Sequence, residues 1–153
     1  MKKIIWIIGA VICLIIVGFA IRSRTSQVQY SPYGNEISIV TLGEIDFSAE
    51  VVASSEKTAL GLSGRESICE KCGMIFVFNE EDYRPFWMKD MKFDLDMIYI
   101  SGDKIIYIAK NVPHEKGMKE VVRPDARADK ILEVNAGTSD GLGLKVGDTL
   151  RIR

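Results

Sequence analysis

The chain has a single histidine, His114, among its 153 residues. A metalloprotease helix needs two histidines and is therefore excluded, and no Ser-His-Asp arrangement is recognisable in the sequence. His114 stands in the loop between Pro113 and Gly117, where a lone histidine is usually solvated, so we expect no catalytic role for it. The glycine-rich segment 137–147 lacks the Lys-Ser/Thr pair of a phosphate-binding loop. We accordingly predict no catalytic residue, no metal ligand and no cofactor.

Basic runs are also missing from the chain. It holds 20 basic and 21 acidic residues, and four of the basic ones flank the first apolar run. Without those four (Lys2, Lys3, Arg22 and Arg24), 16 basic residues face 21 acidic ones, which is a net charge of −5. Nucleic acids and anionic lipid surfaces attract clustered lysine and arginine. The composition therefore predicts no nucleic-acid partner.

The N-terminal run from Ile4 to Ile21 is apolar throughout and carries no charge. As a helix it has the minimum length to cross a hydrocarbon layer of about 30 Å. We therefore predict that residues 1–24 form a signal anchor that attaches the chain to a membrane. A cleaved signal peptide is the alternative, with Gly18 and Ala20 as small residues before the cut. The apolar run is longer than the apolar region of usual signal peptides, which favours the uncleaved anchor.

The sequence gives little direct information on which side of the membrane the domain lies. Basic residues flank the apolar run on both sides in equal number. A three-residue tail before the run favours a tail that stays inside and a domain outside. We predict a single-pass protein with an extracytoplasmic domain, or a secreted one if the segment is cleaved.

After the anchor, residues 25–36 are polar and are interpreted as a linker, and residues 37–153 as a β domain. Short apolar runs separated by turn residues predict strands. The expected strands are 37–42, 45–53, 74–78, 86–91, 95–100, 104–109, 131–134 and 149–152. We expect short helices at 56–60 and near 140–142, and a long surface loop over 110–130. The pattern predicts a mainly β barrel or sandwich of short, mostly antiparallel strands.

Three segments can be compared with a known family: GMIFVF (73–78), FWMKD (86–90) and LDMIYI (95–100). Together with Gly61-Leu62, Arg65, 111–113, 132–137 and 143–148, they resemble the domain of unknown function 192 family. The pattern of that family includes a Gly-Met-Leu-Phe-x-Phe strand, a Phe-Trp-Met-x-Asn-Thr segment and a Pro-Leu-Asp-Ile strand. The resemblance implies a compact, mostly β domain, commonly exported or attached to a membrane, and it implies no particular activity.

The chain departs from the family pattern at four of these positions. Asp90 replaces asparagine, Met91 threonine, Asp94 proline and Ser63 methionine. An amide-to-carboxylate change removes two hydrogen-bond donors and adds a charge. A family ligand held by that amide would be recognised differently here.

The stretch 73–100 combines aromatic residues with charge, as a small binding cleft requires. We select Trp87, Met88, Lys89, Asp90 and Asp96 as the candidate pocket. The leading hypothesis is the binding of a small ligand or a partner segment. The alternatives are an enzyme that uses Asp96 or Asp90 with Lys89, and a structural accessory domain. In the structural alternative, Asp96 fixes a loop by accepting backbone N–H bonds.

Cys69 and Cys72 form a CxxC pair. Such a pair can be a disulfide, two free thiols, a redox pair or half of a zinc site. The remaining zinc candidates, His114 and Cys13, lie far away in the sequence. A strand rather than a helix is expected after the pair, unlike in thioredoxin-type sites. We therefore favour a local disulfide or two free thiols.

Overall fold

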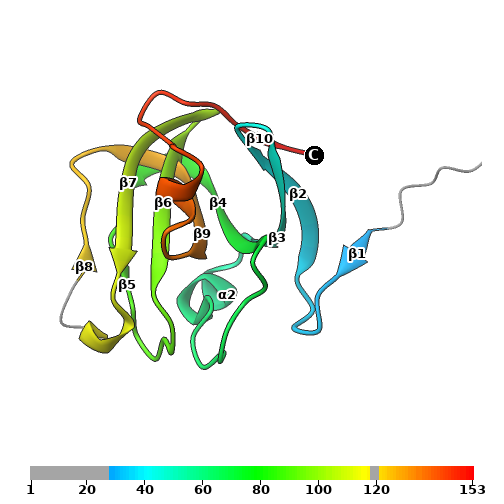
Figure 1. Cartoon of the computed structure of the whole chain (residues 1–153). Coiled ribbons are helices and arrows are strands. Elements are labelled where there is room, and N and C mark those ends of the chain that lie inside the picture. Colours follow the sequence, from blue (N-terminus) through cyan, green and yellow to red (C-terminus); the bar gives the residue numbers. More distant parts are fainter. Residues whose placement is uncertain (1–27, 118–120) are drawn as a thin grey trace, which may run out of the picture.

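The computed structural model describes residues 28–117 and 121–153, which form a mainly β structure with two short α-helices (Figure 1). The predicted mainly β class is thus confirmed. The strands are β1 (Gln29–Tyr30), β2 (Glu36–Leu42), β3 (Ile45–Val52), β4 (Cys72–Tyr83), β5 (Phe86–Trp87), β6 (Leu95–Ser101), β7 (Lys104–Val112), β8 (Val121–Val122), β9 (Arg127–Asn135) and β10 (Leu150–Ile152). The helices are α2 (Ser55–Leu60), α3 (Thr138–Gly141) and the 3-10 turn η1 (His114–Lys116).

Eight strands form one mixed sheet in the order β1-β2-β3-β4-β9-β6-β7, with β10 paired to β2. Only the β3–β4 contact among these pairs is parallel. The segment before β10 also bonds to the start of β7: the Gly147 N–H donates to the Ile105 carbonyl at 2.8 Å, and the Leu150 N–H donates to the Asp103 carbonyl at 2.9 Å. The two sides of the sheet are therefore linked through β10, and the strands curve around an enclosed core (Figure 1).

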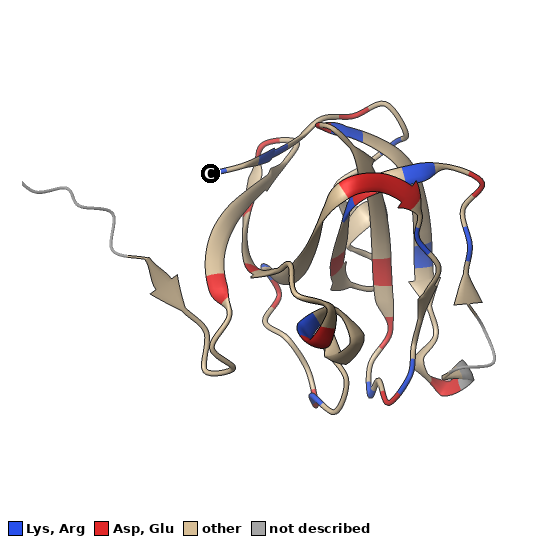
Figure 2. Ribbon diagram, turned by 180° about the vertical axis from the view of Figure 1, so that it is seen from behind, with Lys and Arg blue, Asp and Glu red and all other residues tan. Residues whose placement is uncertain are grey.

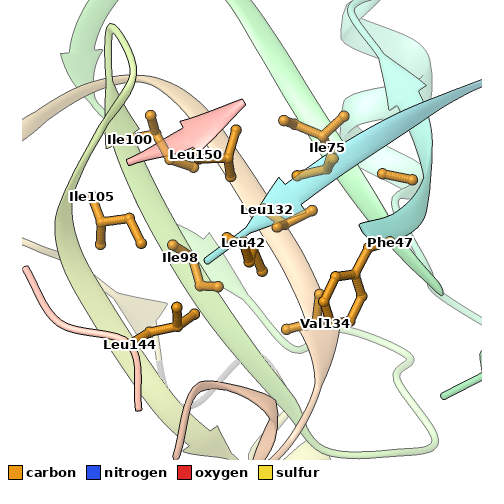
Figure 3. Packing of buried hydrophobic residues seen from close by; sticks show 12 residues of the cluster. Leu42, Phe47, Ile75, Ile98, Ile100, Ile105, Leu132, Val134, Leu144 and Leu150 are labelled. Carbon is orange, nitrogen blue, oxygen red and sulfur yellow. The ribbon is translucent and has the colours of Figure 1, made fainter. Parts of the chain in front are cut away.

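The enclosed core contains aliphatic side chains from every long strand (Figure 3). Ile98 and Ile100 of β6, Leu132 and Val134 of β9 and Ile75 of β4 are completely buried there. On β6 and β9 these apolar residues are two positions apart in the sequence, and residues two apart on a strand point to the same face of the sheet. Burial of such side chains contributes about 1.5–3 kcal/mol each.

A second core covers the outer face of β4, β9, β6 and β7. It contains the alternate residues of those strands together with Leu62 and Met88 from the connecting segments. The small β5–β8 sheet lies over this face, and the ring of Phe86 packs edge-on against Phe76 at 4.9 Å and Tyr99 at 6.3 Å. The central strands are therefore buried on both faces, and their continuous apolar runs are typical of that environment.

Three predicted elements differ from the structure. Of the strand expected at 86–91, only Phe86–Trp87 is a strand, because the chain then turns at Asp90, whose φ is +55°. The prediction of a loop over 110–130 was wrong at both ends, where β7 continues to Val112 and β9 begins at Arg127. Strand β4 reaches Tyr83 because its polar end pairs with the early residues of β9 after a register shift.

The range predicted as a linker, residues 25–36, contains ordered structure from Val28 onward. Gln29 and Tyr30 pair with the start of β2, and a turn follows in which Ser31 and Asn35 are buried. The predicted anchor, residues 1–24 with its span from Ile4 to Ile21, lies outside the described residues. Within residues 28–117 and 121–153 no helix is long and apolar enough to cross a membrane.

Candidate functional site

Glu50 of β3 organises a polar cluster at one end of the sheet. Its carboxylate accepts hydrogen bonds from Ser31 Oγ at 3.0 Å, from Asn35 Nδ2 at 2.7 Å and from both terminal nitrogens of Arg65 at 2.5 and 3.0 Å. Burial by itself raises the pKa of Glu50, but the bonds from Arg65, Asn35 and Ser31 outweigh that effect and hold the pKa below its usual value. The carboxylate is therefore charged and fully engaged at neutral pH.

Arg65 connects this cluster to the surface. Its side chain is only 8% exposed, and the Tyr33 ring stacks on its guanidinium group at 3.7 Å. A bidentate pair with a carboxylate fixes the guanidinium plane, and the stacked ring adds a cation–π contact. Tyr33 itself is 62% exposed. The exposed side chain of Tyr33 is thus held in place by its contact with the Arg65–Glu50 ion pair.

Helix α2 forms the opposite wall. Ser54 caps its N-terminus by accepting from the Lys57 N–H, and Gly61 ends it at a positive φ of +52°. Lys57 Nζ donates to the Gly34 carbonyl at 2.9 Å and so ties the helix to the turn that carries Tyr33. Leu60, the last helical residue, is 63% exposed. The helix therefore presents an apolar side chain on the same rim as an aromatic one.

The turn after α2 is bonded to the segment that follows Trp87. Ser63 Oγ donates to the Lys89 carbonyl at 2.8 Å, and the Gly64 N–H donates to the Asp90 carbonyl at 2.8 Å. Leu62, the residue before Ser63, is buried in the outer core. The two segments are therefore held together as one surface.

These elements enclose a groove of about 440 Å³, called the Tyr33 groove below. It is lined by Tyr33, Asn35, Lys57, Leu60, Ser63 and Arg65, among others. The volume is in the range of small-ligand sites, which is ~300–1,000 Å³. Asn35 is 5% exposed, and its Oδ1 is buried without a hydrogen-bond partner. The groove thus has two exposed apolar walls, Tyr33 and Leu60, whereas the Asn35 acceptor is closed off from solvent.

The candidate pocket residues next to this groove differ in their exposure. Trp87 is 49% exposed, whereas Met88 is 1% exposed and packs in the outer core. Lys89 and Asp90 are exposed, and their carbonyls receive the hydrogen bonds from Ser63 and Gly64. Trp87, Lys89 and Asp90 are thus on a surface segment that adjoins the Tyr33 groove.

Asp96 lies apart from the other candidates. Its carboxylate accepts from the backbone N–H groups of Asn111 at 2.8 Å, Gly137 at 3.2 Å and Ser139 at 2.7 Å. It is completely buried and shares the inner face of β6 with Ile98, whereas the Phe86–Met88 segment packs on the outer face. The five candidates are therefore not gathered in one pocket, and the contacts of Asp96 are those of the structural interpretation.

Cys69 and Cys72 are bonded to each other as a disulfide, with Cα atoms 5.0 Å apart. The bond closes a small turn before β4, and Asn135 Nδ2 donates to the Cys69 carbonyl at 2.9 Å. Cys69 is exposed and Cys72 half-buried. The turn is thus joined to the end of β9 as well as to β4.

His114 is paired with Asp94. The backbone N–H of His114 donates to Asp94 Oδ1 at 2.9 Å, and the ring Nδ1 lies 2.6 Å from the same oxygen. These contacts hold the pKa of Asp94 below its usual value. Among the described residues there is no group of three or more His, Cys, Asp or Glu side chains that could hold a metal ion.

The residues of the Tyr33 groove were not among the predicted site residues. Glu50 is one polar position in an alternating strand, and Tyr33 and Asn35 stand in a segment with the composition of a linker. Arg65 was noted only as part of the family pattern. No local signal joins these positions, because pairing between distant segments of the chain brings them together.

A family model described as DUF192, Uncharacterized ACR, matches residues 38–152. A solved structure of a protein of unknown function from Novosphingobium aromaticivorans DSM 12444 is similar at a TM-score of 0.72 and 28% identity, over 83% of this chain and 94% of that one. A protein from Sinorhizobium meliloti 1021, whose description proposes a transcription regulator, has a TM-score of 0.69 and 28% identity over 82% of this chain and 97% of its own. No curated protein matches the chain.

Proposed function

The chain belongs to the DUF192 family, as its motifs suggested, and we propose that it is a membrane-anchored, extracytoplasmic domain that binds a small ligand in the Tyr33 groove. The observation that carries the proposal is a groove of about 440 Å³ that is lined by two exposed apolar side chains, Tyr33 and Leu60. A ligand that covers both side chains would gain about 25 cal/mol for each Å² of apolar surface removed from water.

The polar groups of the groove favour binding over catalysis. Glu50 and Arg65 neutralise each other, and Ser63 Oγ donates to a backbone carbonyl instead of to a base. Covalent or acid–base catalysis needs a nucleophile or proton carrier beside a base that is free to accept the proton. The chemistry of the groove therefore supports recognition, and the enzyme that would use Asp90 with Lys89 stays the alternative.

The proposed location is supported by two features. The apolar run from Ile4 to Ile21 has the length of a membrane span. The exposed Cys69 is joined to Cys72 in a disulfide, and disulfides persist in oxidising compartments outside the cytoplasm. If the N-terminal segment is cleaved, the same domain is secreted.

Nucleic acid is not included among the proposed partners. Acidic and basic residues are interspersed over the strands and loops in Figure 2, and the domain has an acidic net charge. Nucleic-acid surfaces need a basic patch or stripe. We therefore do not propose for this chain the role in transcription that the description of the Sinorhizobium protein gives to that protein.

A second candidate function is the binding of a protein segment at Trp87. Trp87 is 49% exposed although Phe86 and Met88, on either side of it, pack into the outer core. Exposed, rigidly held tryptophans are typical binding residues at protein interfaces. Loss of partner capture in Trp87→Ala, with ligand binding in the groove unchanged, would favour this candidate.

The groove proposal is tested by the molecule that stays bound to the full-length chain. Mass spectrometry of protein purified in detergent is expected to find one small molecule that is depleted in Leu60→Asp, because a charge would replace an apolar wall. Val146→Asp is the matched control, since Val146 is exposed to 65% and is not among the groove residues. Purified protein that carries no molecule, or equal amounts in both variants, would instead favour the structural accessory domain.

A further inference from the structure

Strand β7 is the last strand of the large sheet, and β6 pairs with one of its two edges. The other edge is covered only near its start, where Ile105 exchanges backbone hydrogen bonds of 2.8 and 2.9 Å with the segment 147–149. From Tyr107 onward, the described part of the chain has no strand paired with this edge. An edge strand directs a row of N–H and C=O groups outward. The first part of the edge thus shows that it accepts an extended segment, and its second part is open to one.

A groove of about 600 Å³, called the β7–β8 groove below, follows this part of the edge. It is lined by residues 107–113 on one side and by residues 121–123 on the other. Successive side chains of a strand point to opposite faces of the sheet. Consecutive residues of β7 therefore line one groove because the groove follows the edge of the strand. A molecule bound there would contact the backbone of β7.

The opposite side of the groove is also a strand. Val121 and Val122 form β8, which pairs with β5 in the separate two-stranded sheet. Figure 1 shows β8 beside β7, and both strands contribute to the lining. Among the residues that the structure describes, β8 has no strand partner on its second edge. An extended segment in the groove would therefore find backbone partners on both sides and would join the small sheet to the large one.

The charged side chains of the lining are basic. Lys110 and Arg123 line the groove and are exposed, and no acidic residue is among the described residues of the lining. Lys110 Nζ lies 2.6 Å from Asp140, but both side chains of this pair are well exposed. Such surface ion pairs contribute little to stability, so a carboxylate of a bound segment could share or replace the contact at little cost. The groove therefore favours an acidic segment.

We propose that the β7–β8 groove binds an extended, acidic segment of a partner protein by strand addition. The backbone of the segment pairs with β7 and β8, and its carboxylates contact Lys110 and Arg123. Main-chain hydrogen bonds supply the affinity in this mode of recognition, and side-chain contacts supply the specificity. This inference goes beyond the proposed function, because neither Trp87 nor any residue of the Tyr33 groove lines the β7–β8 groove.

Strand addition is tested with the blocked peptide acetyl-Asp-Val-Thr-Val-Asp-amide on the full-length, ¹⁵N-labelled chain in detergent. The peptide is expected to shift the backbone amide signals of Ile108, Ala109 and Lys110 and to slow hydrogen exchange along β7. The control peptide carries N-methyl groups on both valines, which removes two N–H donors of one edge and keeps every side chain. Its Kd should be at least about tenfold higher, because the backbone hydrogen bonds of that edge are lost.

The preference for acidic segments is tested by a charge exchange. Lys110→Glu should raise the Kd of the acidic peptide roughly fivefold and should lower that of acetyl-Lys-Val-Thr-Val-Lys-amide. Lys145→Glu is the matched control, because Lys145 is exposed and is not among the lining residues. Its Kd values for both peptides should equal those of the wild type. The amide spectrum of each variant shows whether the fold is kept.

Each contrary outcome removes a defined part of the inference. Signals that do not shift at millimolar peptide, or equal Kd values for the peptide and its N-methylated form, would overturn strand addition. Shifts of the same signals on dilution without peptide would mean that a second copy of the chain binds the edge, which contradicts a partner segment. Equal Kd values for Lys110→Glu and the wild type would overturn the preference for acidic segments. The molecule retained in the Tyr33 groove tests the proposed function independently of these results.

Discussion

At the scale of single residues, Glu133 is the most unusual side chain of the fold. It stands on β9 between its register partners Met74 and Met97 and is 5% exposed. Burial raises the pKa of Glu133 to about 8. Burial, together with the charges of Glu133 and Tyr107, also raises the pKa of Tyr99. Glu133 is therefore protonated in the native state at neutral pH, and it tolerates an apolar environment because it is uncharged.

This protonation makes the stability of the domain depend on pH. The pKa of Glu133 is about 8 in the folded chain, against 4.5 for an ordinary glutamate side chain. Between these values the native state holds a proton that the unfolded state has lost, so the free energy of unfolding falls as the pH rises. The slope of one such group approaches ~1.4 kcal/mol for each pH unit.

Glu133→Gln is expected to remove this contribution, because the amide is neutral at every pH. Urea unfolding of the wild type should show a loss on the order of 2 kcal/mol between about pH 5 and pH 7 that the variant does not show. An exposed control, Glu56→Gln on α2, should keep the wild-type slope. Parallel curves for the wild type and Glu133→Gln would mean that the carboxyl group is not protonated in the native state.

At the scale of the elements, Asp96 connects three segments of the chain. It lies on β6 and accepts from the N–H groups of Asn111 at the end of β7 and of Gly137 and Ser139 at the start of α3. Helix α3 has only four residues and buries only Ser139. The position of α3 therefore depends strongly on hydrogen bonds to one carboxylate.

Asp96→Asn replaces one carboxylate oxygen with a donor, which then faces one of these N–H groups. We expect a loss of roughly 1–3 kcal/mol in stability, as for a buried hydrogen bond that is left unmade. Hydrogen exchange should speed up most at Ser139, and ligand binding in the Tyr33 groove should be unchanged. Asp103→Asn, at an exposed turn position, is the matched control. Loss of ligand binding with unchanged stability would instead return Asp96 to a functional role.

Elements that depend on neighbouring residues could be predicted from the sequence, and those that depend on distant ones could not. The turn at Gly43 and Glu44 and the turn at Gly102 and Asp103 gave the β2–β3 and β6–β7 hairpins nearly in full. The polar end of β4 carries no strand pattern of its own. It is a strand because Asp82 and Tyr83 pair with Ala128 and Arg127 of β9. Tertiary pairing overrides local propensity there.

The same distinction explains why the sequence pointed to the residues around Trp87 and not to the Tyr33 groove. Aromatic and charged residues around Trp87 drew attention as a cluster in the sequence, yet Met88 and Asp96 are buried on opposite faces of the sheet. The Tyr33 groove is lined by residues from 33–35 and 54–65, and Glu50 of β3 joins the two segments through its bonds to Asn35 and Arg65. A site built from such separate segments becomes visible only in the folded structure.

At the scale of the whole molecule, the described domain occupies residues 28–153 apart from 118–120, and the predicted anchor precedes it. The C-terminus is fixed to the sheet: the Arg153 N–H donates to the Ile39 carbonyl at 2.9 Å, and its guanidinium donates to the Asp46 carboxylate at 2.7 Å. A reporter fused after Arg153 therefore reports the side of the membrane on which the folded domain lies, provided that a flexible linker leaves these contacts intact.

An alkaline phosphatase fusion of this kind is expected to be active, because the enzyme needs an oxidising compartment and the domain is proposed to lie outside the cytoplasm. A cytoplasm-dependent fluorescent fusion at the same position should be dark. The apparent mass of the active fusion then separates the anchor from the alternative, since cleavage near Ala20 would shorten the chain by about two kilodaltons and release it from the membrane fraction. An inactive phosphatase on a well-expressed, membrane-bound fusion would reverse the orientation and remove the oxidising environment that a Cys69–Cys72 disulfide requires.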